Sequence, residues 1–149
     1  MFNLVFFEPE IPQNTGAAGR LCLATGSTLH LIKPLGFSLD DKAVRRAGLD
    51  YWKEVPLKVW DSLPDLQAAH PDSRFWLLST KASRTHWDTS FQEGDFFIFG
   101  PESRGLPESL LSEHPDETLK IPMQVSSTRS LNVATSAAIV LYEAWRQIQ

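Results

Sequence analysis

The residues most suited to ligand binding or catalysis carry a carboxylate, a hydroxyl and a guanidinium, and they follow a short apolar run. Phe96 to Phe99 are four consecutive apolar residues, three of them phenylalanine, and such a run predicts a strand buried on both faces of a sheet. The strand must stop at Gly100-Pro101, because proline offers no amide to a neighbouring strand. Glu102, Ser103 and Arg104 follow directly. They are either a ligand site at the carboxyl end of a strand or an ordinary βα turn in solvent.

Two other predicted strands end in loops of similar character. Leu78 is followed by Ser79-Thr80, and Ile121 is followed by Pro122-Met123. Apolar walls with free backbone amides and carbonyls suit a flat heteroaromatic group such as adenine. The common phosphate-binding patterns, G-x-G-x-x-G and G-x-x-x-x-G-K, do not occur in the sequence. A nucleoside without a polyphosphate therefore fits these loops better than ATP or NAD.

Other kinds of chemistry find little support in the composition. The single cysteine, Cys22, excludes an internal disulfide and is expected to fill the core, and no metal-ligand spacing is present. No apolar run approaches the roughly 18 residues of a membrane span, and the start lacks a signal-peptide pattern. We therefore expect a cytoplasmic protein without a membrane partner. A net charge of −4 argues against a wholly basic nucleic-acid binder, but it permits a local basic patch.

The elements that must position these loops alternate between strand and helix. We expect one domain over residues 1–149, with strands over 2–7, 29–32, 55–59, 75–78, 96–99 and 118–121. Helices are expected from a cap at Asn14 or Thr15 to Gly26, and over 40–47, 62–69, 108–111 and 130–148. This order predicts an α/β fold with a mostly parallel sheet and helices on both faces.

The last predicted helix, residues 130–148, is apolar over a broader arc than one core-facing stripe needs. One stripe holds positions 134, 138, 141, 145 and 148, and a second beside it holds 133, 137, 140 and 144. A second copy of the chain would cover the surplus, so we expect a homodimer. The alternative is a helix that lies deep in its own core.

Three stretches carry a family resemblance. Ile11 to Arg20 resembles motif 1 of the SPOUT class of RNA 2′-O-methyltransferases, and Phe99 to Pro107 resembles motif 2. Ile121 to Met123, with Arg129 to Ala134, resembles motif 3. The resemblance runs the whole chain and is strongest to the small, single-domain members that methylate the wobble nucleotide, position 34, of leucine tRNAs.

The resemblance implies a fold and a cofactor. In this class the C-terminal part of the sheet is threaded into a deep trefoil knot, and the knot loops bind S-adenosylmethionine in a bent conformation. The cofactor contacts that carry over by motif are Leu78, Gly100, Glu102, Ile121, Ser130, Leu131 and Asn132. We expect the Cα of Gly100 to face the ligand closely, and Glu102 to hold the knot loop by accepting amide hydrogen bonds.

The resemblance also implies the catalytic residues. The class assigns the central role in methyl transfer to the motif 1 arginine, here Arg20. Deprotonating a guanidinium near pH 7 is costly, so Arg20 acts either as the base or by orienting the ribose hydroxyl and a phosphate. Asn14 would fix the loop or the ribose, or would be a plain helix cap. A purely structural Arg20 would instead pair with Glu8 or Glu10.

The partner that the resemblance implies is the anticodon arm of tRNA. The candidates for RNA contacts are Lys42, Arg45, Arg46, Lys81, Arg84, Arg104 and Arg129, and two subunits would double this patch. Other functions remain open at this point. The chain could methylate another tRNA or ribosomal RNA site, or bind cofactor and RNA without methylating. A flavodoxin-type nucleotide module is a third class, but Glu8-Pro9-Glu10 would repel its phosphate.

Overall fold

The computed structural model describes residues 1–47, 49–124 and 130–149. Arg129, one of the expected RNA contacts, lies outside the described residues. In the described part, seven strands form one sheet in the order β3-β2-β1-β6-β4-β7-β5, and each of the pairings between neighbouring strands is parallel. The predicted parallel sheet is confirmed. In chain order the strands are β1 Asn3–Phe7, β2 Thr28–Ile32, β3 Leu57–Trp60, β4 Phe75–Leu78, β5 Arg84–Thr85, β6 Phe96–Phe99 and β7 Thr118–Lys120.

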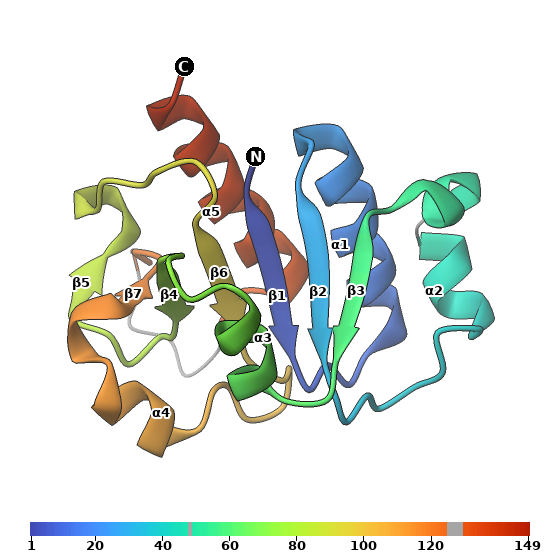
Figure 1. Ribbon diagram of the computed structural model, residues 1–149, viewed down its shortest axis with the longest axis horizontal. Helices are drawn as coiled ribbons and strands as arrows, with labels where there is room; N and C mark the ends of the chain where they lie inside the picture. The colour runs from blue at the N-terminus through green and yellow to red at the C-terminus, as the bar shows by residue number, and fades with distance from the viewer. Residues whose placement is uncertain (48, 125–129) are drawn as a thin grey trace.

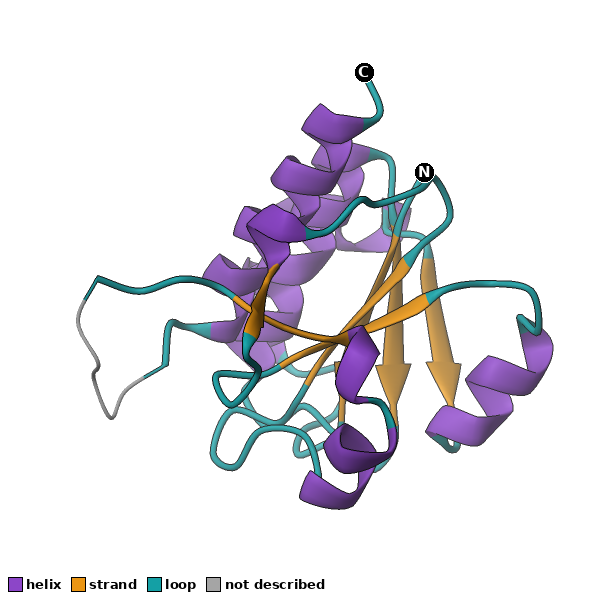
Figure 2. Ribbon diagram, turned by 90° about the vertical axis from the view of Figure 1, so that its left-hand side faces the viewer, coloured by secondary structure: helices purple, strands orange, loops and turns teal. Residues whose placement is uncertain are grey.

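Helices cover both faces of this sheet, as predicted. The α-helices are α1 Pro12–Thr25, α2 Lys42–Ala47, α3 Leu63–Ala69, α4 Glu108–Glu113 and α5 Val133–Gln147, and short 3₁₀ helices are η1 Leu49–Glu54, η2 His86–Asp88 and η3 Pro115–Glu117. The long helices α1 and α5 pack side by side on one face, and α3 and α4 lie on the other (Figures 1 and 2). None of the helices in the described ranges is long and apolar enough to cross a membrane.

Strand β6 lies at the centre of the sheet, between β1 and β4. Phe97 and Phe99 face the core beneath α1 and α5, whereas Phe96 and Ile98 belong to the core beneath α3. All four side chains are buried. The unbroken apolar run therefore reflects a strand with both faces covered, and the break at Gly100 places the following loop at the carboxyl edge of the sheet.

The start of α1 differs from the prediction. The helix begins at Pro12, whose fixed φ suits a first helical position, and not after a cap at Asn14 or Thr15. Its N-cap residue, Ile11, offers no side-chain hydrogen bond. The predicted end is confirmed, because Gly26 adopts the left-handed conformation with a φ of 65°. Asn14 therefore lies inside the first turn, free to point away from its own helix.

The start of α5 also differs from the prediction. Asn132 is the N-cap, and its Oδ1 accepts a hydrogen bond from the amide of Thr135 at 3.1 Å. Residues 130–132 consequently precede the helix. One side of α5 is buried through Ala137, Val140, Leu141 and Ala144, whereas Ile139 and Tyr142 remain 36% and 48% exposed. All the apolar positions of the two predicted stripes are buried or half-buried within the single chain, so the homodimer and the helix that lies deep in its own core both stay open.

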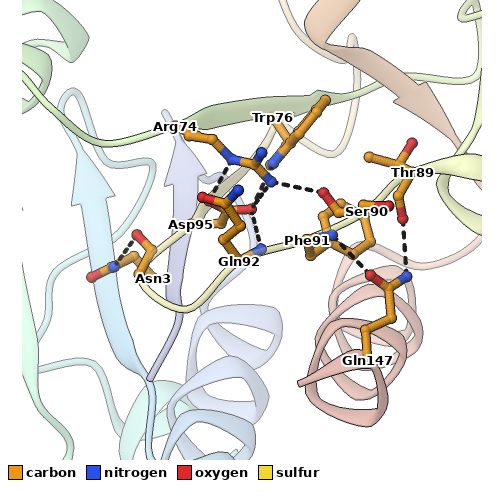
Figure 3. A network of polar contacts seen from close by, with 10 residues as sticks. Asn3, Arg74, Trp76, Thr89, Ser90, Phe91, Gln92, Asp95 and Gln147 are labelled. Atoms are coloured by element: carbon orange, nitrogen blue, oxygen red, sulfur yellow. Dashed lines mark hydrogen bonds and ion pairs between the residues drawn. The ribbon is translucent and has the colours of Figure 1, made fainter. Parts of the chain in front are cut away.

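A polar network fixes the opposite, amino edge of the sheet (Figure 3). The buried Asp95 carboxylate accepts hydrogen bonds from Arg74 at 2.8 and 3.0 Å and from the indole of Trp76 at 3.0 Å. Gln147 near the end of α5 accepts from the amide of Phe91 and donates to the carbonyl of Thr89. Because these partners satisfy one another's hydrogen-bonding groups, the network stabilises this edge of the sheet.

Candidate functional site

A cavity of about 500 Å³ opens at the carboxyl ends of β4, β6 and β7. Three segments wall it: the loop after β4, the loop after β6 and the residues just before α5. Ile11 and Asn14 add the start of α1. All seven residues expected to contact the cofactor line this cavity: Leu78, Gly100, Glu102, Ile121, Ser130, Leu131 and Asn132. A cavity thus lies at the predicted end of β6, while the ligand and the role of each residue stay predictions.

The lining combines apolar walls with a few polar groups. Phe99, Leu106 and Leu111 contribute apolar surface beside Leu78 and Ile121. Hydroxyls come from Ser79, Thr80 and Ser103, which lie in loops predicted from the sequence, and from Ser136, which sequence reasoning missed. Ser136 lies within α5, so its position in the lining depends on how the helix packs against the loops. This mixture suits a nucleoside better than a polyphosphate.

Gly100 is also required by the shape of its own loop. A Cβ built on Gly100 would lie 2.3 Å from both the carbonyl carbon of Gly105 and the amide nitrogen of Leu106. Two backbone segments of the loop therefore approach each other closely at this position. Gly100 lines the cavity, and the expectation that its Cα faces a ligand stays a prediction.

Glu102 caps α1 from a distant part of the chain. Its Oε1 accepts a hydrogen bond from the amide of Glu10, and its Oε2 accepts one from the amide of Ile11, both at 2.9 Å. A carboxylate beside the first amides of a helix satisfies orphan donors and interacts favourably with the helix dipole. The predicted amide acceptor is confirmed, but the amides belong to the motif 1 segment and not to the loop of Glu102 itself.

Asn14 joins this cap to the start of α5. Its Nδ2 donates to Oε2 of Glu102 at 3.1 Å, and its Oδ1 accepts from Nδ2 of Asn132 at 3.0 Å. The side chain is buried. The interpretation of Asn14 as a plain cap of its own helix is therefore wrong. Residues from the three predicted motifs meet at one point on the cavity wall.

A second set of contacts ties the same two loops in the reverse direction. The carboxylate of Glu10 accepts hydrogen bonds from the amide and hydroxyl of Ser103 at 2.7 and 2.8 Å, which lower the pKa of Glu10. Arg104 pairs with Glu8 at 2.6 Å and with Glu10 at 3.6 Å. Glu8 has a φ of 50°, a conformation uncommon outside glycine. Arg104, expected to contact RNA, is thus engaged within the chain.

Arg20 lies apart from the cavity. It is exposed on the outer side of α1 and is not among the residues that line the cavity. It lies six positions after Asn14, a rise of about 9 Å along the helix. Among the described residues, the structure gives it no ion pair, and Glu8 and Glu10 are instead paired with Arg104. The purely structural brace predicted for Arg20 is therefore formed by Arg104.

The remaining expected RNA contacts are scattered around the surface. Lys81 lines the cavity and pairs with Glu108, which lowers the pKa of that carboxylate. Arg45 pairs with Asp40 at 3.4 Å on α2, and Arg46 and Lys42 are exposed there. Such exposed pairs stabilise little, so these cations stay available to a phosphate. Arg84 instead lies over the ring of Trp76 and is not among the residues that line the cavity.

Two further findings concern the cysteine and possible metal ligands. Cys22 is buried in the core, and burial raises its pKa to about 12, so the expectation of a core residue is confirmed. In the described part of the chain, no group of three or more histidine, cysteine or acidic residues could hold a metal ion.

The parallel α/β sheet, with a cavity at its carboxyl edge walled by residues of all three motifs, is consistent with the resemblance to RNA 2′-O-methyltransferases found in the sequence. The chain belongs to the SpoU rRNA methylase family, whose model matches residues 1–142.

Individual relatives match this chain over almost its whole length. The chain is 50% identical to a tRNA (cytidine(34)-2′-O)-methyltransferase of Methylovorus glucosotrophus, covering 99% of this chain and 96% of the relative. It is 47% identical to the protein of the same name from Escherichia coli K12, covering 99% and 94%. A solved structure described as "structural insights into the 2-OH methylation of C/U34 on tRNA" superposes with a TM-score of 0.94 at 46% identity, covering 99% and 96%.

Proposed function

We propose that this chain transfers a methyl group from S-adenosylmethionine to the ribose 2′-hydroxyl of nucleotide 34, the wobble position, of tRNA. The observation that carries the proposal is the meeting of Asn14, Glu102 and Asn132 on one cavity wall. Near-full-length identity of about half to methyltransferases of this specificity supports it. Cytidine or a 5-modified uridine at position 34 of leucine tRNAs is the proposed target.

The cavity fits the cofactor in size and chemistry. The adenosine would lie against the apolar side chains and backbone amides of Leu78, Gly100 and Ile121, and the residues before α5 would close over it: Ser130, Leu131 and Asn132. S-adenosylmethionine would supply the methyl group from its sulfonium sulfur, and the thioether that remains, S-adenosylhomocysteine, is a good leaving group. The protein therefore needs mainly to position the ribose hydroxyl and to accept its proton.

Arg20 and Asn14 are the proposed catalytic residues, and a homodimer would bring them into one site. Asn14 reaches the cavity of its own chain, whereas Arg20 is exposed on the outer side of α1. The exposed side of α5, with Ile139 and Tyr142, lies in the same helical layer (Figure 2). A second copy docked on this layer would cover the apolar side chains and place Arg20 beside the partner's cavity.

The RNA would approach along the cavity rim. Lys81 and Arg104 lie there, Arg45 and Arg46 lie on α2, and Arg129 is proposed from its motif alone. Positive side chains of this kind hold phosphates while the target nucleotide enters the site. A tRNA substrate would place the protein in the cytoplasm. We further propose a single domain over residues 1–149 with a C-terminal trefoil knot, as the resemblance found in the sequence implies.

The test is methylation of tRNA with methyl-labelled cofactor, followed by nuclease mapping of the labelled nucleotide. We expect label at position 34 of leucine tRNAs. An anticodon stem-loop with 2′-deoxycytidine at position 34 is the matched control, because it lacks only the accepting hydroxyl and should take up no label. Label at another tRNA site or in ribosomal RNA would support the alternative substrates. Cofactor binding without any transfer would support a non-catalytic protein.

A further inference from the structure

The cofactor loop and the first loop of the chain hold each other through contacts in both directions. We call the segment after β6 the cofactor loop. Its Glu102 accepts hydrogen bonds from the backbone amides of Glu10 and Ile11. In return, the side chain of Glu10 accepts hydrogen bonds from the amide and the hydroxyl of Ser103. We refer to these residues, Glu10, Ile11, Glu102 and Ser103, as the clasp. The segments are more than 90 residues apart in sequence. The clasp therefore joins two loops that are distant in sequence, and the ion pairs of Arg104 and the Asn14–Glu102 hydrogen bond link the same segments.

One half of the clasp determines how α1 begins. Ile11 offers no side-chain cap, and Glu102 accepts its amide hydrogen. If the cofactor loop moved away, the amides of Glu10 and Ile11 would lose this partner. The loop therefore stabilises the first turn of α1, which carries Asn14, in this position.

The other half of the clasp positions the loop that lines the cavity. Glu102, Ser103 and Arg104 all line it, and the carboxylate of Glu10 restrains Ser103 and Arg104 from outside. Glu10 itself is not among the residues that line the cavity. A ligand that orders the loop would consequently affect the position of α1 through Glu10, although the ligand itself would not contact Glu10.

We propose that Glu10 is a positioning residue that couples the two ligands of the enzyme: a cofactor in the cavity orders the clasp, and the clasp presents α1 to RNA. The inference rests on the proposed function, since it assumes that this chain binds S-adenosylmethionine and tRNA. Coupling between two sites is reciprocal and typically changes each affinity about 5- to 150-fold. We expect S-adenosylhomocysteine to raise the affinity for tRNA about tenfold, and tRNA to raise the affinity for S-adenosylhomocysteine equally.

The test compares tRNA dissociation constants with and without saturating S-adenosylhomocysteine in three proteins. Glu10→Ala removes the carboxylate that accepts hydrogen bonds from Ser103, but it keeps the backbone amide of residue 10 that donates to Glu102. Glu93→Ala is the matched control. It removes the same charge from an exposed residue in the loop before β6, at the opposite edge of the sheet. The ratio of the two constants cancels the general effect of charge on RNA affinity.

The outcomes separate coupling from stability and from the proposed function. We expect the ratio to fall to near one in Glu10→Ala, to stay about tenfold in Glu93→Ala and to recover partly in Glu10→Gln, which keeps one acceptor oxygen. A wild-type ratio near one, or an unchanged ratio in a folded Glu10→Ala protein, overturns the coupling role while position 34 is still methylated. Loss of thermal stability in Glu10→Ala with the ratio intact gives Glu10 a structural role only, and likewise overturns it. No tRNA binding by the wild type at all would instead contradict the proposed function.

Discussion

The side chain of Asn132 donates a hydrogen bond to the side chain of Asn14 at 3.0 Å, across 118 residues of sequence. The amide group of Asn14 is thereby fixed in orientation, because its nitrogen must face the carboxylate of Glu102. Asn132 is fixed as well, since its own oxygen caps α5. An amide at position 14 is the one side chain of this size that offers a donor to Glu102 and an acceptor to Asn132.

Asn14→Asp tests this arrangement with almost no change of shape. The new carboxylate would face Glu102 with no donor between them, so we expect a loss of about 1–3 kcal/mol in the free energy of unfolding at pH 7. Urea unfolding of the variant and of Asn14→Ala gives the comparison. Repulsion between like charges should make Asn14→Asp less stable than Asn14→Ala. The difference in the free energy of unfolding should become smaller in acid, as one carboxyl takes up a proton. Equal stability of wild type and Asn14→Asp would contradict the hydrogen-bond assignment.

Gly100→Ala should damage the cofactor loop directly. The added Cβ would overlap the backbone of Gly105 and Leu106, which cannot yield as a flexible side chain would. We expect a loss of about 1–3 kcal/mol in stability together with weaker binding of S-adenosylhomocysteine in titration calorimetry. Gly26→Ala is the control. It adds strain at a left-handed position with open space around it, so it should lower stability while leaving cofactor affinity unchanged. Unchanged affinity in Gly100→Ala would show that the loop tolerates displacement.

Ile139→Asp tests the proposed homodimer. Ile139 lies on the exposed side of α5, and an unpaired carboxylate in an apolar interface would weaken association strongly. Sedimentation at micromolar concentration should show a dimer for the wild type and a 16.8 kDa species for the variant. Val59→Asp, on the edge strand β3, should leave the dimer intact. A monomeric wild type across that range would remove the two-subunit site from the proposal.

The parts of the fold that sequence could predict are those fixed by local chemistry. The apolar run of β6 follows from burial on both faces, Gly26 ends α1 through its left-handed backbone, and Ser62 caps α3 by accepting the amide of Asp65. Each of these features depends on residues within a few positions of one another. The location of the cavity followed from the same reasoning, because parallel strands bring their loops to one edge.

The parts that sequence could not predict depend on distant partners. The start of α1 is set by Glu102, which lies 91 residues away from Ile11. The two residues of β5 carry no apolar signal, since Arg84 and Thr85 form a strand only by pairing with β7. Gly100 is adjacent to a predicted ligand site, but the atoms that exclude a side chain belong to its own loop. Folding brings these groups together, and no spacing in the sequence records it.

His30 should make stability depend on pH in a defined window. Burial lowers the pKa of its ring to about 4 from an ordinary value of 6.5, with smaller contributions from His70 and Lys58. Its Nδ1 accepts from the indole of Trp60 at 3.0 Å, so the proton lies on Nε2, facing Asn3. The unfolded chain takes up a proton near pH 6.5 and the folded chain only near pH 4. The stabilisation is therefore complete above pH 6.5 and is lost as the pH falls from 6.5 to 4, by up to about 3 kcal/mol.

Urea unfolding at pH 7, 5.5 and 4.5 checks this window. His30→Gln keeps an acceptor and a donor but cannot be protonated, so its stability should vary less with pH than that of the wild type. His114→Gln, a histidine outside this aromatic cluster, is the control and should follow the wild type. Parallel curves for wild type and His30→Gln would show that the buried ring does not set this pH dependence.

Arg20→Ala separates catalysis from binding. Arg20 does not line the cavity, so the variant should bind S-adenosylmethionine almost normally, and tRNA binding should fall only modestly, as for one lost phosphate contact among several. If Arg20 orients or deprotonates the ribose hydroxyl, its contact matters mainly in the transition state. Methyl transfer should then drop by about two to four orders of magnitude, the span for removing a positioned proton-transfer or charge-stabilising group.

Two further variants define what Arg20 contributes. Arg20→Lys keeps the charge but not the planar fork, and it should be nearly as poor as Arg20→Ala if bidentate orientation is what counts. Lys58→Ala removes a positive charge from the exposed edge strand β3 and should leave single-turnover rates unchanged. Circular dichroism melts of the Arg20 variants should match the wild type, since Glu8 and Glu10 are engaged by Arg104 and Ser103 instead. A stable, fully active Arg20→Ala enzyme would contradict the catalytic assignment, and the proton of the ribose hydroxyl would then need another acceptor at the cavity.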